Sequence, residues 1–213
     1  MATRLKLYNG ALRILGERKL ASLTENREPR RVLDDMWDDD FTNTCLEQGM
    51  WNFATRSIEL TYSPSVTPSF GYIRAFDKPS DWVRTTIISI DEYFSAPMLQ
   101  YVDEAGYWRC EYDTIYVKYV SNDSSYGNDL SLWPSSFVRY FEAALAFEAC
   151  DRITKSDSKR DEIRADVRRL LADARSKDAM NQPIVFPPAG SWATSRRVAA
   201  TQRERGKRGQ LIG

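Results

Sequence analysis

The chain has 213 residues, of which 42% are hydrophobic and 28% are charged, the balance of a globular protein that can bury a core. Thirty basic residues balance thirty acidic ones, and the sequence contains no histidine. The lack of histidine excludes Ser-His and Cys-His nucleophile pairs and histidine general bases, and it removes most zinc sites. Carboxylate or lysine chemistry remains open, but no pattern of such residues points to it. We therefore expect no enzyme, no catalytic residue, no metal and no cofactor.

The net charge of zero conceals an asymmetry along the chain. Residues 179–213 contain six basic residues and one acidic residue, a charge of +5. Residues 1–178 contain 24 basic and 29 acidic residues, a charge of −5. A body and a tail of opposite sign can meet between subunits, or the tail can reach a separate acidic partner.

The three cysteines, Cys45, Cys110 and Cys150, are scattered and show no metal-ligand spacing. The first residues are too often polar for a secretory signal, and no stretch predicts a membrane span. These features predict buried, reduced thiols in a bacterial-type or other cytosolic setting, with no membrane partner.

Two helices are predicted before residue 50. The first covers about residues 3–15, where the apolar side chains recur at helical spacing and Gly16 suits the position after the last turn: Leu5, Tyr8, Leu12 and Leu15. The second covers about residues 28–48, with Pro29 in its first turn and an apolar residue at every fourth position: Leu33, Trp37, Phe41 and Cys45.

After Gly49 the pattern changes to the alternation of strands. Five short segments rich in β-branched and aromatic residues follow, and a hairpin turn is predicted around residues 104–106. The segments read SIELTY, YIRAF, WVRTTIISI, YWRCEYD and TIYVKYV. They predict five or six short strands in a β-sandwich or barrel-like module.

Helical periodicity returns in LWPSSFVRYFEAALAFEACDRIT, where Ser135 or Ser136 is the expected N-cap. A last helix follows, with Ile163, Val167, Leu170 and Ala174 on one face. The predicted fold class is α+β: a four-helix bundle, an inserted small antiparallel β module and an extended C-terminal arm. The bundle is assigned to residues 1–53 and 134–180, the module to residues 54–133, and the arm to residues 181–213.

The run DDMWDDD places several carboxylates within two helical turns of the second helix. It can be a solvated helix face near the N-terminal half, a docking site for a basic arm, or a metal site. We take it as a candidate acidic face between subunits, formed by Asp34, Asp35, Asp38 and Asp39.

Four tryptophans lie beside predicted element junctions: Trp51, Trp82, Trp108 and Trp133. The favoured interpretation places them in a seam between the bundle and the β module. The alternative is that some of them anchor an interface, where tryptophan is enriched.

The arm contains an apolar, proline-bounded start and a basic end. It can bind nucleic acid through phosphate contacts, fold against a protein partner, or serve as a solubilising end. We take it as a candidate docking arm, with these contact residues: Ile184, Val185, Phe186, Trp192, Arg196, Arg197, Arg203, Arg205, Lys207 and Arg208.

The order of these segments resembles the tail tubular protein A family, the gatekeeper-type head–tail adaptors of tailed bacteriophages. The resemblance spans roughly residues 5–180 and depends on the order of soft, largely structural motifs. They are YNGALRILGE ending in Leu15-Gly16-Glu17, RRVLDDMWDDDFTNTCLEQGMWNFA containing Arg30-Arg31-Val32-Leu33, Gly49 and Trp51-Asn52-Phe53, then KPSDWVR and WPSSFVRYFEAALAFEACDRIT.

The resemblance implies a structural virion protein at the head–tail interface. Such proteins form a ring, usually of twelve subunits, between the portal protein and the tail nozzle or tube, and genome DNA passes through the lumen without sequence-specific binding. We expect the same here, with the C-terminal arm docking on the portal, although that arm lies outside the matched core. The alternative is a nucleic-acid-binding protein that uses the basic arm.

Overall fold

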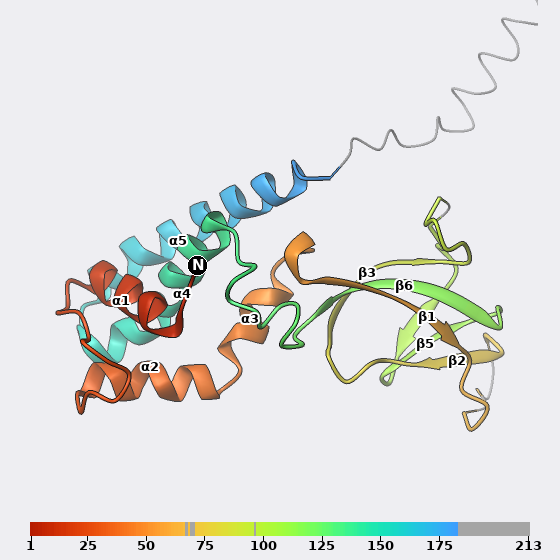
Figure 1. Cartoon of the computed structure of the whole chain (residues 1–213), viewed down its shortest axis with the longest axis horizontal. Coiled ribbons are helices and arrows are strands. Elements are labelled where there is room, and N and C mark those ends of the chain that lie inside the picture. Colours follow the sequence, from red (N-terminus) through yellow and green to blue (C-terminus); the bar gives the residue numbers. More distant parts are fainter. Residues whose placement is uncertain (67, 69–70, 96, 183–213) are drawn as a thin grey trace, which may run out of the picture. The chain divides into compact units, whose positions relative to one another are not determined.

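The computed structural model describes residues 1–66, 68, 71–95 and 97–182, and Met1–Asn181 form one compact unit. Within the described residues, five α-helices and two three-stranded antiparallel sheets make an α+β fold (Figure 1). Three helices precede the strands and two follow them. The β module is therefore continuous in sequence between two helical segments.

Helix α1, Arg4–Leu15, confirms the first predicted helix. The Thr3 side chain accepts a hydrogen bond from the backbone N–H of Lys6, which caps the first turn. Gly16 ends the helix in the left-handed conformation, with φ of 82°. Its Leu7, Leu12 and Leu15 side chains are buried, so one apolar face of α1 is committed to the core.

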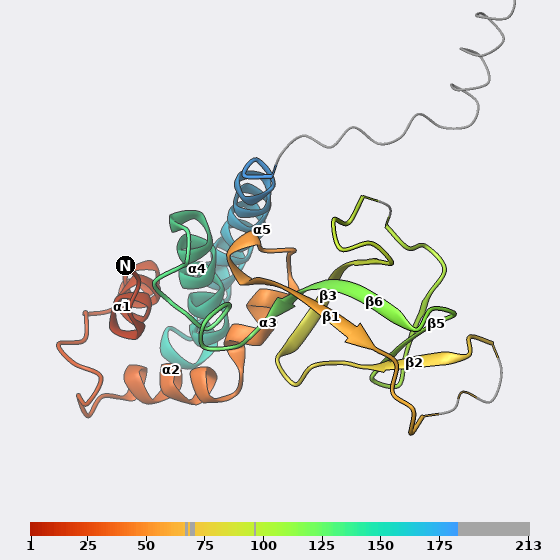
Figure 2. The same cartoon turned by 45° about the vertical axis from the view of Figure 1, so that its right-hand side comes forward.

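The predicted helix over residues 28–48 is wrong, and the four-helix bundle is wrong with it. The chain forms α2, Glu28–Asp38, and α3, Phe41–Glu47, separated at Asp40, whose φ is 56°. A left-handed residue cannot continue a right-handed helix. The apolar residues that recur at every fourth position are therefore divided between two helices. Figures 1 and 2 show α3 between the other helices and the strands, and it contacts both α4 and β3.

Helix α4, Ser135–Ile153, is the central helix, and it contacts α1, α2, α3 and α5. Its apolar residues point in all directions, as expected for a helix covered on most sides. The N-cap is Pro134, without a side-chain hydrogen bond, so the expected serine cap is wrong. Helix α5, Asp157–Ala179, packs on α4 through one stripe that includes Ile163 and Ala174.

The first sheet has the order β1–β6–β3, and the second has the order β2–β5–β4. The first contains β1, Thr55–Thr61, β6, Thr114–Ser121, and β3, Trp82–Ser89. The second contains β2, Arg74–Asp77, β5, Tyr107–Cys110, and β4, Val102–Glu104. The structure thus confirms the five predicted strands and adds β4.

The predicted hairpin turn is also confirmed. Ala105 and Gly106 join β4 to β5 and both have positive φ, 52° and 85°. Two consecutive positive φ angles match the right-handed twist of the flanking strands, so they favour a tight two-residue turn.

Two hydrophobic cores fill the described part of the chain, one among the helices and one between the sheets. Trp51 and Trp133 belong to the helical core, where each ring lies 4.8 Å from that of Phe137. Trp82 and Trp108 belong to the β core, with ring centroids 6.4 Å apart. The tryptophans therefore do not fill one common seam, and that interpretation is wrong.

Strand β6 links the two cores. Its Tyr119 is buried in the β core, while the next residue, Val120, is buried in the helical core. Successive side chains of a strand point to opposite faces, so a single strand can contribute to both.

The carboxylate of Asp81 holds one end of the first sheet together. Asp81, just before β3, accepts hydrogen bonds from Arg56 of β1 and from Tyr119 and Ser121 of β6. Burial opposes the ionisation of Asp81, but these hydrogen bonds outweigh it and hold its pKa below the ordinary value.

The last turn of α5 is clamped to the start of the β module. The Asp178 carboxylate accepts the backbone N–H of Asn52 at 3.0 Å, and the Asn52 amide donates to the Asp178 carbonyl at 2.8 Å. Arg175 donates to the carbonyl of Gln48. These bonds hold the C-terminal end of α5 next to the residues that lead into β1.

Candidate interaction surfaces

The ten residues proposed for the docking arm lie outside the described residues. Their role stays a prediction. The four aspartates of the candidate acidic face lie on α2 and at its end, where their surroundings can be described.

Asp34 is engaged within the subunit. Its carboxylate lies 2.8 Å from the Arg4 guanidinium, pairs also with Arg30, and lies 2.9 Å from the Tyr8 hydroxyl. Arg4 stacks over the rings of Tyr8 and Trp37, at 5.4 and 5.1 Å from their centroids. This network joins α1 to α2. Burial raises the pKa of Tyr8, Asp34 adds to the shift, and Arg4 opposes it. Asp34 therefore contributes to packing rather than to a free acidic surface.

The other aspartates of the run are exposed. Asp35 lies 3.6 Å from Arg152, and Asp38 lies 3.6 Å from Arg4, both in solvent where ion pairs contribute little. Asp39 and Asp40 are exposed at the break between α2 and α3. Asp35, Asp38 and Asp39 can still contact a neighbour, so the predicted acidic face loses Asp34 and remains a prediction for the other three.

All three thiols are buried and unpaired. Burial raises the pKa of Cys45 to about 12, so the thiol stays protonated near neutral pH. Burial also raises the pKa of Cys110. A packing role fits both side chains.

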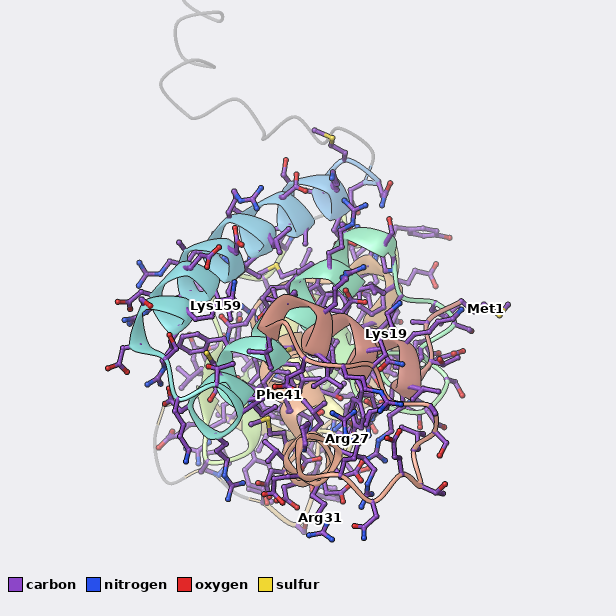
Figure 3. The ribbon with its side chains drawn as sticks, turned by 90° about the vertical axis from the view of Figure 1, so that its left-hand side faces the viewer. Met1, Lys19, Arg27, Arg31, Phe41 and Lys159 are labelled. Carbon is purple, nitrogen blue, oxygen red and sulfur yellow. The ribbon has the colours of Figure 1, made fainter. Side chains whose placement is uncertain are left out.

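Depressions that share Glu142 lie along α1, α4 and α5, and we call them together the basic groove. It consists of three neighbouring depressions of about 270, 320 and 360 Å³. All three are lined by Glu142, which lies 3.1 Å from Arg13. The cationic residues of the lining are Lys6, Arg13, Lys19 and Arg139, and its acidic residues are Glu142 and Asp166, so cations outnumber carboxylates four to two. Figure 3 views the helical part and shows Met1 and Lys19 on its α1 side.

Helix packing explains why Glu142 sits at the centre of this groove. Gly10 of α1 has no side chain, and a Cβ there would lie 2.0 Å from Glu142 Cδ. The carboxylate therefore occupies the space that the glycine leaves. Burial raises the pKa of Glu142, and the charges of Arg13 and Arg139 only partly oppose the shift.

The described residues of the loop between β3 and β4, 90–95 and 97–101, form a second surface, which we call the acidic loop. It exposes Ile90, Tyr93 and Leu99, the last two at 80% and 89%. Asp91 folds the loop by accepting hydrogen bonds from the backbone N–H and the hydroxyl of Ser95. Exposed large apolar residues at this density are typical of contact surfaces.

The acidic loop lies beside one face of the first sheet. Tyr116 of β6 has a raised pKa because Glu59 of β1, Glu92 and Asp91 all place negative charge near it. Lys118 of β6 lies 4.2 Å from the Phe94 ring centroid and holds the loop against the sheet. Glu59 and Glu92 thus extend the apolar surface with negative charge.

Sequence reasoning missed both surfaces. The acidic loop had a signal, because SIDEYFSAPMLQY combines several large apolar residues with two acids in a segment too irregular for a strand. The basic groove had none, because its lining comes from α1, α4 and α5, and α1 is far from the other two helices in the sequence.

In the described residues, no group of three or more His, Cys, Asp or Glu side chains is arranged to hold a metal ion. None of the described helices is long and apolar enough to cross a membrane.

A scan against protein-family models found no match for the chain, and a search of curated proteins found no significant relative.

Proposed function

We propose that the protein is a structural virion component, a head–tail adaptor of a tailed bacteriophage. In this proposal it forms a ring between the portal protein and the tail nozzle or tube, and the C-terminal arm docks on the portal. Genome DNA passes through the lumen without sequence-specific binding.

The observation that carries the proposal is the order of the family-like motifs and the structural role of each. Gly16 ends α1, and Arg30 holds Asp34 at the contact between α1 and α2. Gly49 leaves space for the buried indole of Trp51, since a Cβ there would lie 2.7 Å from that ring. The backbone N–H of Asn52 donates to the Asp178 carboxylate in the last turn of α5. Each of these motif residues has a role in packing, which suits a protein whose function lies in its subunit architecture.

The surfaces of the described part support a role in assembly. It combines a basic groove and an acidic loop with exposed apolar side chains, the features that protein contacts use. An adaptor needs contacts with its neighbours in the ring and with the proteins on either side of it.

The decisive test is assembly with the portal protein of the same virus. We expect the purified full-length chain to bind portal and to form rings visible by electron microscopy. A chain truncated after Met180 should lose portal binding. A matched full-length control, with the six basic residues of the arm changed to glutamine, separates the contribution of charge from that of the apolar start.

Equal portal binding by the full-length and truncated chains would remove the docking-arm part of the proposal. Absence of any portal complex or ring would remove the adaptor function itself.

The second candidate is a nucleic-acid-binding protein, favoured by the six basic residues of the arm. It predicts an affinity for duplex DNA that falls steeply between low and physiological salt. No binding at low salt would eliminate this candidate. The charge of −5 on residues 1–178 makes it the weaker one, because the body repels DNA.

A further inference from the structure

We propose that the acidic loop of one copy docks in the basic groove of a second copy, so that subunits join head to tail. This inference rests on the proposed ring and names the surfaces that close it.

The distribution of charge between the two halves of the body is the first support. Residues 54–133, the β module, contain six basic and eleven acidic residues, a charge of −5. The helical segments, residues 1–53 and 134–178, contain 18 of each. The whole negative charge of the body therefore belongs to the β module, and the helical part has no excess of acids to repel it.

The surroundings of the acidic loop concentrate part of this negative charge on one surface. On one face of the first sheet the Tyr116 hydroxyl lies 3.5 Å from Glu59 Oε1, and Lys118 of the same strand lies 4.2 Å from the Phe94 ring of the loop that carries Asp91 and Glu92. Beside them Tyr93 and Leu99 project almost fully into solvent. The loop thus offers apolar side chains next to carboxylates.

The basic groove offers the complement. Lys6, Lys19 and Arg139 are exposed, and Arg13 is exposed while it pairs with Glu142. Half-buried apolar residues line the same depressions: Ile14, Val138 and Leu170. A concave surface with cations around an apolar lining fits a loop that carries Leu99, Tyr93 and carboxylates.

The two surfaces belong to different elements of the same subunit, so the contact between copies is heterologous. A heterologous contact leaves one loop and one groove unused at the ends, and repetition gives a closed ring or an open filament. A second copy is therefore the occupant that uses both surfaces.

Charge reversal tests the contact in the full-length chain. The groove variant is Lys19→Glu with Arg139→Glu, which keeps the pair between Arg13 and Glu142. The loop variant is Glu59→Lys with Glu92→Lys, which keeps the Asp91 turn. Self-association is measured by sedimentation velocity at low salt, and folding by circular dichroism.

We expect each variant alone to raise the dissociation constant of self-association at least about tenfold, since like charges then face each other across the contact. An equimolar mixture of the two variants should restore assembly, because each loop then meets a groove of opposite sign. Added salt should weaken the wild-type contact.

Control variants carry the same charge changes elsewhere. Arg164→Glu with Arg168→Glu changes exposed residues of α5. Asp77→Lys with Glu111→Lys changes an exposed residue of β2 and the exposed residue that follows β5. Both controls should self-associate as the wild type does.

Failure of the mixture to associate, or equal weakening by the controls, would overturn the proposed contact. A wild-type chain that stays monomeric at millimolar concentration and low salt would overturn it as well. Rings on the portal that both variants form normally would leave the adaptor function intact and remove only this contact. Binding of short duplex DNA that the groove variant alone abolishes would assign the groove to nucleic acid instead.

Discussion

Gly10 and Glu142 show how a single missing side chain positions a charge. The two residues belong to α1 and α4, and the carboxyl group of Glu142 fills the space where a Cβ of residue 10 would be. The pair with Arg13 then stabilises this half-buried carboxylate.

We expect Gly10→Ala to destabilise the protein by about 1–3 kcal/mol, the usual cost of overpacking, because the new methyl group displaces Glu142. In a Glu142→Ala background the same change should be neutral or stabilising by up to about 1 kcal/mol, since alanine favours helix over glycine. Urea denaturation of the four proteins gives the coupling between the sites. Equal effects in both backgrounds would contradict the steric explanation.

Asp81 is the residue where pH should act on stability. Its folded pKa is lowered, so its contribution is fully present above the unfolded value near 3.8 and is lost as pH falls through the folded value. We expect Asp81→Asn to cost about 1–3 kcal/mol at neutral pH, because three hydrogen bonds lose a charged acceptor. The cost should stay constant down to about pH 4 and shrink below it.

Urea denaturation between pH 7 and pH 3 measures this cost. Asp77→Asn, at an exposed position of β2, is the control and should have little effect at any pH. A cost for Asp81→Asn that grows on acidification would contradict the assigned direction.

At the scale of elements, the break between α2 and α3 explains what periodicity could not predict. Leu33, Trp37, Phe41 and Cys45 keep a four-residue spacing through the break, so the sequence pattern reads as one helix. The decisive feature is the left-handed backbone of Asp40. Aspartate can adopt this conformation, but its presence in a sequence does not predict it. By contrast, Gly16 is a strong end signal, and α1 was predicted to within one residue.

We expect Asp40→Gly to stabilise the protein by roughly 0.5–1 kcal/mol, because glycine adopts a positive φ without the steric cost that a Cβ brings. Asp39→Gly is the matched control, since Asp39 has a φ of −81° and gains nothing from the change. Thermal unfolding followed by circular dichroism compares the two. Stabilisation by both variants, or by neither, would show that backbone strain at Asp40 is not the cause.

The candidate surfaces were the least predictable part of the molecule. Strand alternation and turn residues predicted most of the β module, because those signals are local. The basic groove depends on Gly10 meeting Glu142, a contact that only the packed helices create. The acidic run was visible in the sequence, but whether Asp34 faced solvent or Arg4 depended on how α1 lies on α2.

At the scale of the whole molecule, β6 couples the two cores. Val120 is fully buried among helical residues, and Tyr119 is fully buried in the β core. A substitution in this strand should therefore destabilise both the helical core and the β core.

We expect Val120→Ala to destabilise the protein by roughly 1–3 kcal/mol through the cavity it leaves in the helical core. Hydrogen exchange should quicken in α4 and also in β1 and β3, because the two cores share the strand. Val102→Ala, on the exposed strand β4, is the control and should change neither. Faster exchange confined to α4 would mean that the cores open independently.

The aromatic cluster at Phe137 decides how the two ends of the β module are held. Trp51, just before the module, and Trp133, at its end, both pack on this ring. The two ends of the module therefore meet at one buried side chain of α4. The distance between these ends is set by the helical core and does not depend on how many residues lie between them.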